Sequence, residues 1–255
     1  MINIKEKLRN GESILGTMIN AFDNLDVVRI FKEAGFDLIV IDNEHGYIDY
    51  SKTSDMLNLA RALELGGLVR IPELKREVVH KYMEMGADGI LMPNCTSKKQ
   101  AEKLIEYAKY SPQGNRGVSL FRSHSGYKEI PSGLDYMKEA NKKSLMIVQI
   151  ESKKGVENIN EILEVDGIDA AFIGPNDLSQ GYDIFGDKEN PILLKAIDKV
   201  INSAKQHNKF SGIFTNGDPK EMRRWIRKGM QLNLWSSDTN MLMNYAKRGV
   251  SLIKK

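Results

Sequence analysis

The feature that most constrains the fold is a regular alternation along the chain between short apolar segments of strand character and longer segments with helical periodicity. Strand character is found at residues 13–19, 37–42, 67–71, 89–92, 145–150, 169–173, 210–214 and 231–236. Apolar residues recur at helical spacing between them, as in 51–64, 97–109, 156–164, 192–207 and 219–228. Strands separated by helices predict βαβ crossovers and a parallel sheet. About eight such units in 255 residues predict an α/β fold, a closed (β/α)8 TIM barrel that occupies residues 1–255 as a single domain.

An open, doubly wound sheet is the competing architecture. It would commonly carry a glycine-rich phosphate turn after its first strand. The segment after Gly16 has no second or third glycine at the required spacing, which favours the barrel. One stretch, 110–133, is long, rich in Gly and Ser and without clear periodicity, which predicts an active-site or interface loop.

Charge and cysteine content restrict the partners and the compartment. Lys and Arg number 37 against 34 Asp and Glu, a formal net charge of +3, and the chain lacks the basic stripe of a nucleic-acid binder. The N-terminal segment lacks the apolar core of a signal peptide, and the longest apolar runs are far below the ~20 residues of a membrane span. Cys95 is the single cysteine, which excludes an intrachain disulfide and points to a reducing compartment. We therefore expect a cytoplasmic protein with no nucleic-acid and no membrane partner.

Polar residues follow the predicted strands in an orderly way. In a TIM barrel the chemistry lies at the C-terminal ends of the strands, so these residues are the candidates for a site. They are Asp42, Glu44 and His45 after the second strand, Arg70 after the third, Gln149 and Glu151 after the fifth, Gly174 to Asp177 after the sixth, and Ser236 to Asp238 after the eighth.

Two of these carboxylates, Glu151 and Asp177, end consecutive strands. Together with waters and substrate oxygens they are suited to share one hard divalent cation, as Mg²⁺ sites do. The alternative is that either acid caps the helix behind it. A zinc site is less favoured, because His45 alone among the four histidines falls at a strand end and there is no cysteine pair.

His45 is a candidate general base, with Asp42 or another acid orienting its ring; the alternative is a structural histidine. Arg70 ends an apolar strand, so its guanidinium needs an anion or a carbonyl. The alternative for Arg70 is a structural ion pair with Asp42 or Glu44.

Some chemistries are disfavoured by what the strand ends lack. No predicted strand has a lysine in its interior or at its exit, where an aldolase that forms a Schiff base would need one. Cys95 has no local histidine, which predicts a buried, inert cysteine. The segment after the last strand lacks the glycines of a phosphate site, so a phosphorylated substrate is not favoured.

Several segments together resemble the HpcH/HpaI aldolase family. They are GFDLIVIDNEHG (35–46), LVRIP (68–72), MGADGILMPNCTSKKQAEKLIEYAKYSPQGNRGVS (85–119), VQIESKKGVENINEIL (148–163) and VDGIDAAFIGPNDLS (165–179). The likeness spans nearly the whole chain. It implies a metal-dependent class II pyruvate aldolase on a TIM barrel of the phosphoenolpyruvate/pyruvate-domain type, using Mg²⁺ or Mn²⁺ and assembled as a homohexamer, a trimer of dimers.

The same resemblance implies a role for each matching residue. Glu151 and Asp177 are similar to the metal ligands, and Arg70 to the arginine that contacts the pyruvyl oxygens, with Gln149 beside it. Backbone N–H groups of the 174–177 turn, which includes Asn176, would receive the carboxylate of the oxo acid.

His45 matches the family's catalytic base, and Glu84 stands at the position of the acid that partners it. This acid is usually an aspartate, so Glu84 adds one methylene to its reach. Met18 stands in the neighbourhood where many members have a tryptophan, and Asn176 replaces a common alanine.

Three functions follow from these residues. The first is the reversible aldol cleavage of a 4-hydroxy-2-oxo acid to pyruvate and an aldehyde, which makes the protein a carbon–carbon lyase. The second is an aldol-type condensing enzyme that acts on a keto acid such as oxaloacetate, like the citrate synthases of siderophore pathways, with Arg122 and His124 as its discriminating residues. The third is a catalytically silent protein that binds an oxo acid, which a mispositioned Glu84 would favour.

Overall fold

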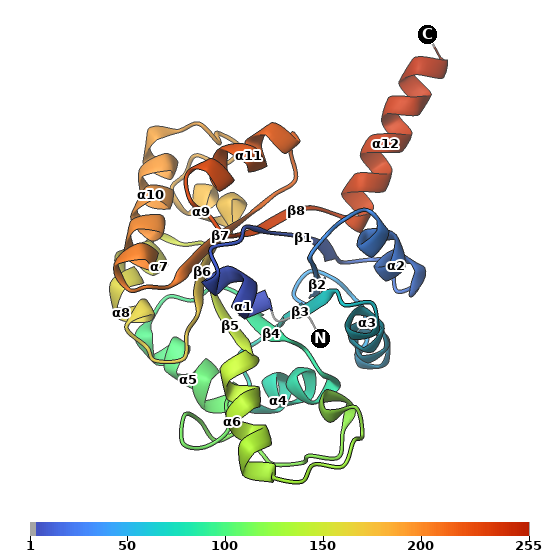
Figure 1. The fold of residues 1–255 in the computed structure, drawn as a ribbon. Helices are drawn as coiled ribbons and strands as arrows, with labels where there is room; N and C mark the ends of the chain where they lie inside the picture. Colours follow the sequence, from blue (N-terminus) through green and yellow to red (C-terminus); the bar gives the residue numbers. More distant parts are fainter. Residues whose placement is uncertain (1–3, 255) are drawn as a thin grey trace.

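The computed structural model describes residues 4–254, and its strands form a closed parallel barrel (Figure 1). In chain order they are β1 (Ile14–Ile19), β2 (Leu38–Asp42), β3 (Gly66–Arg70), β4 (Gly89–Met92), β5 (Leu145–Ile150), β6 (Ala170–Ile173), β7 (Phe210–Thr215) and β8 (Leu232–Ser237). Each strand pairs with its neighbours in sequence, and β8 closes the barrel on β1, where Ile14 lies opposite Leu232. The predicted (β/α)8 barrel is confirmed, and every strand lies within one residue of its predicted bounds.

Helices surround this barrel. They are α1 (Ile4–Arg9), α2 (Asp26–Glu33), α3 (Tyr50–Ala62), α4 (Arg76–Met85), α5 (Lys98–Ala108), α6 (Gly133–Lys143), α7 (Lys153–Glu157), α8 (Ile159–Leu163), α9 (Pro175–Gly181), α10 (Pro191–Gln206), α11 (Pro219–Arg227) and α12 (Asp238–Ile253), with one 3₁₀ turn, η1 (Ser123–Ser125).

The helix expected over 156–164 is two short helices, α7 and α8, that meet at Asn158. The Asn158 side chain donates a hydrogen bond to the carbonyl oxygen of Thr96, at 2.8 Å, and the residue leaves helical geometry (φ −90°, ψ 10°). Asn side chains bond readily to nearby backbone, and here that bond competes with helix continuation.

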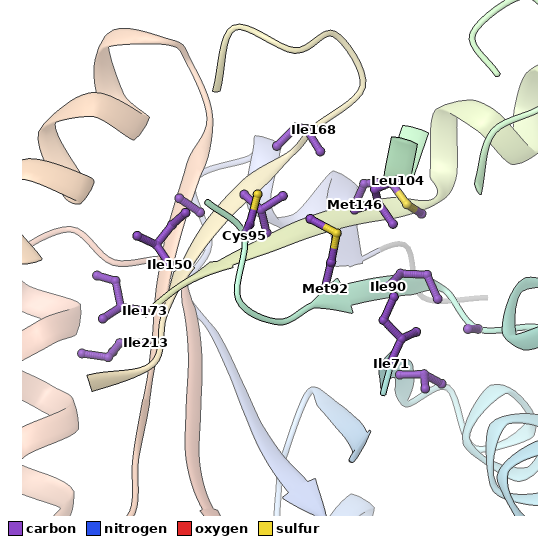
Figure 2. Packing of buried hydrophobic residues seen from close by; sticks show 14 of the residues in the cluster. Ile71, Ile90, Met92, Cys95, Leu104, Met146, Ile150, Ile168, Ile173 and Ile213 are labelled. Atoms are coloured by element: carbon purple, nitrogen blue, oxygen red, sulfur yellow. The ribbon is translucent and has the colours of Figure 1, made fainter. Parts of the chain in front are cut away.

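Two apolar clusters lie on the two faces of the barrel wall. The larger one packs the strands against the outer helices, and Figure 2 shows part of it around Cys95, Met146 and Ile150. The smaller one fills the interior, where α1 contributes Ile4 and Leu8. Both faces of the strands are therefore buried, which explains why the sequence shows them as continuous apolar runs.

The segment 110–133 lies at the N-terminal end of the barrel, away from the strand ends that carry the candidate residues. It follows α5, which returns the chain to that end. Lys109 Nζ bonds to the carbonyl oxygen of Ser144, directly before β5, at 2.9 Å. Arg61, in the last turn of α3, donates to the carbonyl oxygen of Ser123 at 2.8 Å. The segment therefore does not border the candidate site of its own chain, and the other predicted role, an interface loop, stays a prediction.

The C-terminal helix α12 leaves the barrel and projects from it (Figure 1). Of its residues, only Asp238 in the first turn is buried. The rest of the helix exposes large apolar side chains, at Leu242, Met243, Tyr245, Val250, Leu252 and Ile253. Within residues 4–254, no helix combines the length and the hydropathy that crossing a membrane requires.

Candidate active site

A cavity of about 180 Å³ opens at the C-terminal ends of the strands. It is lined by Asp42, His45, Arg70, Gln149, Asn176 and Asp177, six of the residues singled out from the sequence. They come from β2, β3, β5 and the start of α9. A larger hollow, about 770 Å³, lies at the opposite end and is lined by none of these six residues. The mouth of the barrel is therefore the candidate active site.

Arg70 is held by two carboxylates. Its Nε donates to Asp42 Oδ1 at 2.8 Å and its Nη2 to Asp42 Oδ2 at 2.6 Å, while Nη1 lies 3.0 Å from Glu44 Oε2. Burial alone would lower the pKa of Arg70, but the hydrogen bond and the charge of Asp42 outweigh it and the pKa is raised. The structural ion pair considered from the sequence thus exists. Because a guanidinium has five N–H groups and Asp42 takes two, Arg70 keeps donors for a ligand.

Asp42 does not orient the His45 ring. Its carboxylate is occupied by Arg70, and Oδ1 also accepts the backbone N–H groups of Glu44 and His45, at 3.1 and 3.3 Å. A Cβ on Gly46 would lie 2.7 Å from the carbonyl oxygen of Asn20, so the tight turn requires glycine there. The turn leaves His45 exposed at the rim of the cavity.

Glu151 is buried beneath the cavity. Its Oε1 accepts the backbone N–H of Asn94 at 2.7 Å, and its Oε2 accepts a short hydrogen bond from Gln149 Nε2. Burial raises the pKa of Glu151, the nearby charges of Glu44 and Asp177 raise it further, and the two hydrogen bonds only partly oppose this. Gln149 Oε1 is buried without a hydrogen-bond partner.

Gly174 makes room for this pair. A Cβ at position 174 would lie 2.8 Å from Gln149 Nε2 and would press on the Glu151 carboxylate. Pro175 follows as the first residue of α9, so Asn176 and Asp177 lie in the first helical turn. Backbone N–H groups of a first turn have no partner four residues earlier in the helix. The sequence GPND thus brings a carboxylate and free amide donors close to Glu151.

These carboxylates fit a divalent cation. The pKa of Glu44 is raised by burial and by the charges of Asp42 and Asp177, and Asp177 also raises the pKa of Glu151. Such mutual repulsion at a buried site is relieved by a cation. Within residues 4–254 no cluster of three or more His, Cys, Asp or Glu side chains forms a complete ligand set. Glu151 and Asp177 are thus two candidate donors, a number compatible with Mg²⁺, which binds through one or two carboxylates and keeps several waters.

Glu84, predicted as the acid partner of His45, is not brought to the cavity of its own chain. It lies on α4, whose buried residues Val79 and Met83 face the barrel, and its charge acts on His80 and Arg116. The residue is absent from the cavity lining. The direction of the Glu84 side chain is set by the orientation of α4 and not by a strand end. In this orientation Glu84 lies near the 110–133 segment, where its charge acts on Arg116.

Arg122 and His124 also lie away from the mouth. His124 Nδ1 is bonded to Tyr136 Oη at 2.5 Å and Nε2 to the carbonyl oxygen of Ser119 at 3.0 Å. Arg122 is exposed and donates to the carbonyl oxygen of Phe121. They therefore do not select a substrate in the site of their own chain.

Sequence reasoning missed part of the cavity wall. Asn20 follows β1, Phe214 lies on β7, and Asn240 stands in the first turn of α12. Asn20 could have been found by the strand-end rule applied to β1. Asp238, which was noted, has a structural role, since its carboxylate accepts the backbone N–H groups of Asn20, Ala21 and Phe22.

Cysteine and lysine side chains take no part in the cavity lining of the described residues. Cys95 is fully buried, and burial raises the pKa of its thiol to about 12, as expected for an inert cysteine. Within residues 4–254, no lysine is among the residues that line the cavity.

The fold and the mouth place this protein in the class of (β/α)8 barrels with an acidic, arginine-containing site at the C-terminal strand ends. Residues 18–244 match the family model of the HpcH/HpaI aldolase/citrate lyase family. The chain belongs to this family, which confirms the resemblance found in its motifs.

Similar proteins agree with this assignment. The 5-keto-4-deoxy-D-glucarate aldolase of Escherichia coli O6:H1 is 29% identical over 235 residues, which cover 90% of this chain and 91% of that protein. The structure of an HpcH/HpaI aldolase from Desulfitobacterium hafniense DCB-2 is 34% identical, with a TM-score of 0.97 over 100% of this chain and 98% of that one. The citrate synthase SbnG is 24% identical with a TM-score of 0.89, over 100% of this chain and 98% of that one, and shares the fold.

Proposed function

We propose that the protein is a metal-dependent carbon–carbon lyase that reversibly cleaves a 4-hydroxy-2-oxo acid to pyruvate and an aldehyde. The observation that carries this proposal is the pairing at the mouth of the barrel of mutually repelling carboxylates, Glu151 and Asp177, with the buried guanidinium of Arg70. Such a site complements an oxo acid and a cation together. The aldolases among the similar proteins support it.

Glu151 and Asp177 would hold the cation, Mg²⁺ or Mn²⁺. When bound, the cation supplies Lewis acidity that stabilises the negative charge developing on the 2-oxo group as the carbon–carbon bond breaks. Gln149 fixes Glu151 Oε2 by its hydrogen bond and so sets the direction of that donor.

Arg70 and the first turn of α9 would orient the oxo acid. The remaining N–H groups of Arg70 can donate to the pyruvyl oxygens, and their charge is retained because Asp42 stabilises it. The backbone N–H groups of Asn176 and Asp177 would receive the carboxylate. Together these donors hold the substrate with its reacting carbon toward the open side of the cavity.

His45 would transfer the proton. It stands at the rim of the cavity, and among residues 4–254 its ring has no hydrogen-bond partner within the chain. A positioned imidazole is suited to take a proton from a substrate hydroxyl and return it to the pyruvate methyl carbon.

The condensing-enzyme alternative loses its discriminating residues. Arg122 and His124, which would have selected a keto acid as the partner, lie at the opposite end of the barrel from the site of their own chain. We therefore keep the aldolase as the proposed function. The silent-homologue alternative differs in one measurable property, since such a protein would bind pyruvate without exchanging its methyl protons.

We also propose that the protein is a homo-oligomer. The apolar side chains of α12 have no cover within one chain, and a contiguous exposed apolar face of a helix marks an interaction surface. The hexameric trimer of dimers and the cytoplasmic location rest on the family resemblance and on the single cysteine, respectively.

Exchange of the pyruvate methyl protons for deuterium tests the function independently of the aldehyde. In heavy water with Mg²⁺ or Mn²⁺, proton NMR should show loss of the methyl signal. We expect His45→Ala to slow this exchange by roughly 10²–10⁴-fold and chelation to stop it. His207→Ala is the control, because His207 is half-buried and does not line the cavity. Wild-type protein that binds pyruvate in the presence of metal but does not exchange its protons would contradict the proposal and favour the silent homologue.

A further inference from the structure

Arg116 is a buried cation without a partner. Its side chain is 6% exposed, and among residues 4–254 its Nε and Nη2 have no hydrogen-bond acceptor. It forms no ion pair within residues 4–254. Its guanidinium lies over the ring of Tyr110, 4.6 Å from the ring centroid. The Tyr110 hydroxyl is itself buried without a partner. The charge of Glu84 acts on Arg116, but the two residues form no ion pair. A buried guanidinium whose Nε and Nη2 lack acceptors is costly, and proteins rarely keep one.

Arg116 lines a cavity of about 190 Å³ between α4, η1 and α6. Arg61, His124 and Tyr136 line the same cavity. Arg61 uses its Nη1 and Nη2 to hold the carbonyl oxygens of Ser123 and Gly86, both at 2.8 Å, and its buried Nε has no partner. The guanidinium groups of Arg61 and Arg116 therefore border one small cavity, and both have buried N–H donors without an acceptor.

Two acids near the cavity act on its arginines by their charge, Glu84 on Arg116 and Asp88 on Arg61, but form no ion pair with them. Lys143 adds a third cation to the lining, and Asp88 and Glu139 are its acids. Asp88 is committed to the backbone N–H of Gly67, at 2.9 Å, and the exposed Glu139 faces Lys142 and Lys143. Neither acid pairs with Arg116 or Arg61 within the described part of the chain.

We propose that this cavity binds a small oxyanion, a phosphate or a carboxylate, through the guanidinium of Arg116. A planar guanidinium donates two parallel hydrogen bonds to two oxygens of one such anion. Tyr136, whose hydroxyl is bonded to His124, borders the same space and limits the size of the ligand. The site holds the 110–133 segment against the barrel, because Arg116 belongs to that segment and Arg61 ties Ser123 to α3.

This oxyanion site is separate from the proposed aldolase site and does not depend on it. Asp88 directly precedes β4 and Ser144, also in the lining, directly precedes β5, so the cavity lies at the N-terminal end of the barrel. The oxo-acid site lies at the C-terminal end. Occupation of one is therefore not expected to compete with the other.

Thermal unfolding of the full-length protein, with inorganic phosphate and acetate as two separate probes, tests the proposal. Wild type should show a saturable rise in midpoint with one of the two, because at 100 times Kd a ligand of the folded state favours folding about 100-fold. Phosphate alone would identify a phosphate site and acetate alone a carboxylate site. A wild-type midpoint that responds to neither, or only in proportion to ionic strength, would overturn the proposal.

Arg116→Met removes the charge while keeping much of the volume. We expect it to fold and to lose the anion-dependent rise, whereas Arg122→Met, on an exposed arginine of the same segment, should retain it. Should Arg116→Met fail to fold, Arg116→Lys provides the second measurement. Lysine keeps the positive charge but cannot donate two parallel hydrogen bonds, so the Kd for the anion should rise by roughly tenfold or more. An Arg116 variant with wild-type anion affinity would refute the assignment.

Discussion

Arg70 and Asp42 form a bidentate ion pair between the ends of two adjacent strands. Arg70 Nε donates to Asp42 Oδ1 at 2.8 Å, and Arg70 Nη2 donates to Asp42 Oδ2 at 2.6 Å. The two residues lie opposite each other in the register of β2 and β3. The pair therefore has two roles. It links the C-terminal ends of β2 and β3, and its guanidinium lines the cavity of the candidate site.

Removing one partner of this pair should destabilise the fold. We expect Asp42→Asn to lower the free energy of unfolding by roughly 3 kcal/mol, because it removes the two-bond carboxylate partner of a buried guanidinium and leaves it only Glu44. Denaturant unfolding measures this. Asp49→Asn is the matched control, since Asp49 caps α3 on the surface and asparagine caps equally well. Equal stabilities of the two variants would show that the pair adds nothing.

The strands and the strand-end residues were predictable from the sequence because both follow from burial. A strand enclosed on both faces must be a continuous apolar run, and its end is the first polar residue, as at Asp42 and Gln149. Glu84 lies outside the cavity of its own chain because its location depends on the rotation of α4, which tertiary packing decides. The location of the 110–133 segment could not be predicted, because its composition does not reveal at which end of the barrel it lies.

Gly174 should be required for catalysis more than for folding. A Cβ there would displace the Gln149 amide and the Glu151 carboxylate, and a shift of ~1 Å in a site costs ~10²-fold in rate. We expect Gly174→Ala to remain folded and to exchange pyruvate methyl protons at least ~100-fold more slowly. Gly181→Ala, with no neighbour closer than 3.9 Å, serves as the control and should match wild type. A fully active Gly174→Ala protein would argue against Glu151 as a metal ligand.

The oligomer should depend on one face of α12. Leu242, Tyr245 and Leu252 share that face at helical spacing, and the helix of 16 residues is ~24 Å long at ~1.5 Å per residue. We expect the double substitution Leu242→Asp, Leu252→Asp to shift sedimentation to a smaller species with its circular dichroism spectrum preserved. Asn244→Asp, on the opposite face, should leave the assembly intact. An unchanged sedimentation coefficient in the double variant would exclude this face as an interface.

Glu151 should make the metal-free protein less stable at neutral pH. Burial raises its pKa in the folded state above the unfolded value, so the native state binds the proton more tightly than the unfolded chain does. The free energy of unfolding then falls as the pH rises from the unfolded pKa through the raised one, and the penalty is complete above it.

Glu151→Gln removes this penalty. The new amide can still accept the Asn94 N–H. Its NH₂ group replaces the oxygen that accepts from Gln149 Nε2, so the Gln149 amide must flip to present Oε1, which now lacks a partner, as the acceptor. Without divalent cation we expect the variant to be more stable than wild type at pH 7, with the difference shrinking as the pH falls below the raised pKa. Addition of Mg²⁺ should reverse the order, because only wild type gains a ligand of its folded state. Glu161→Gln, at an exposed position on α8, should follow wild type throughout, and a wild-type protein that Mg²⁺ does not stabilise would contradict a cation site at Glu151.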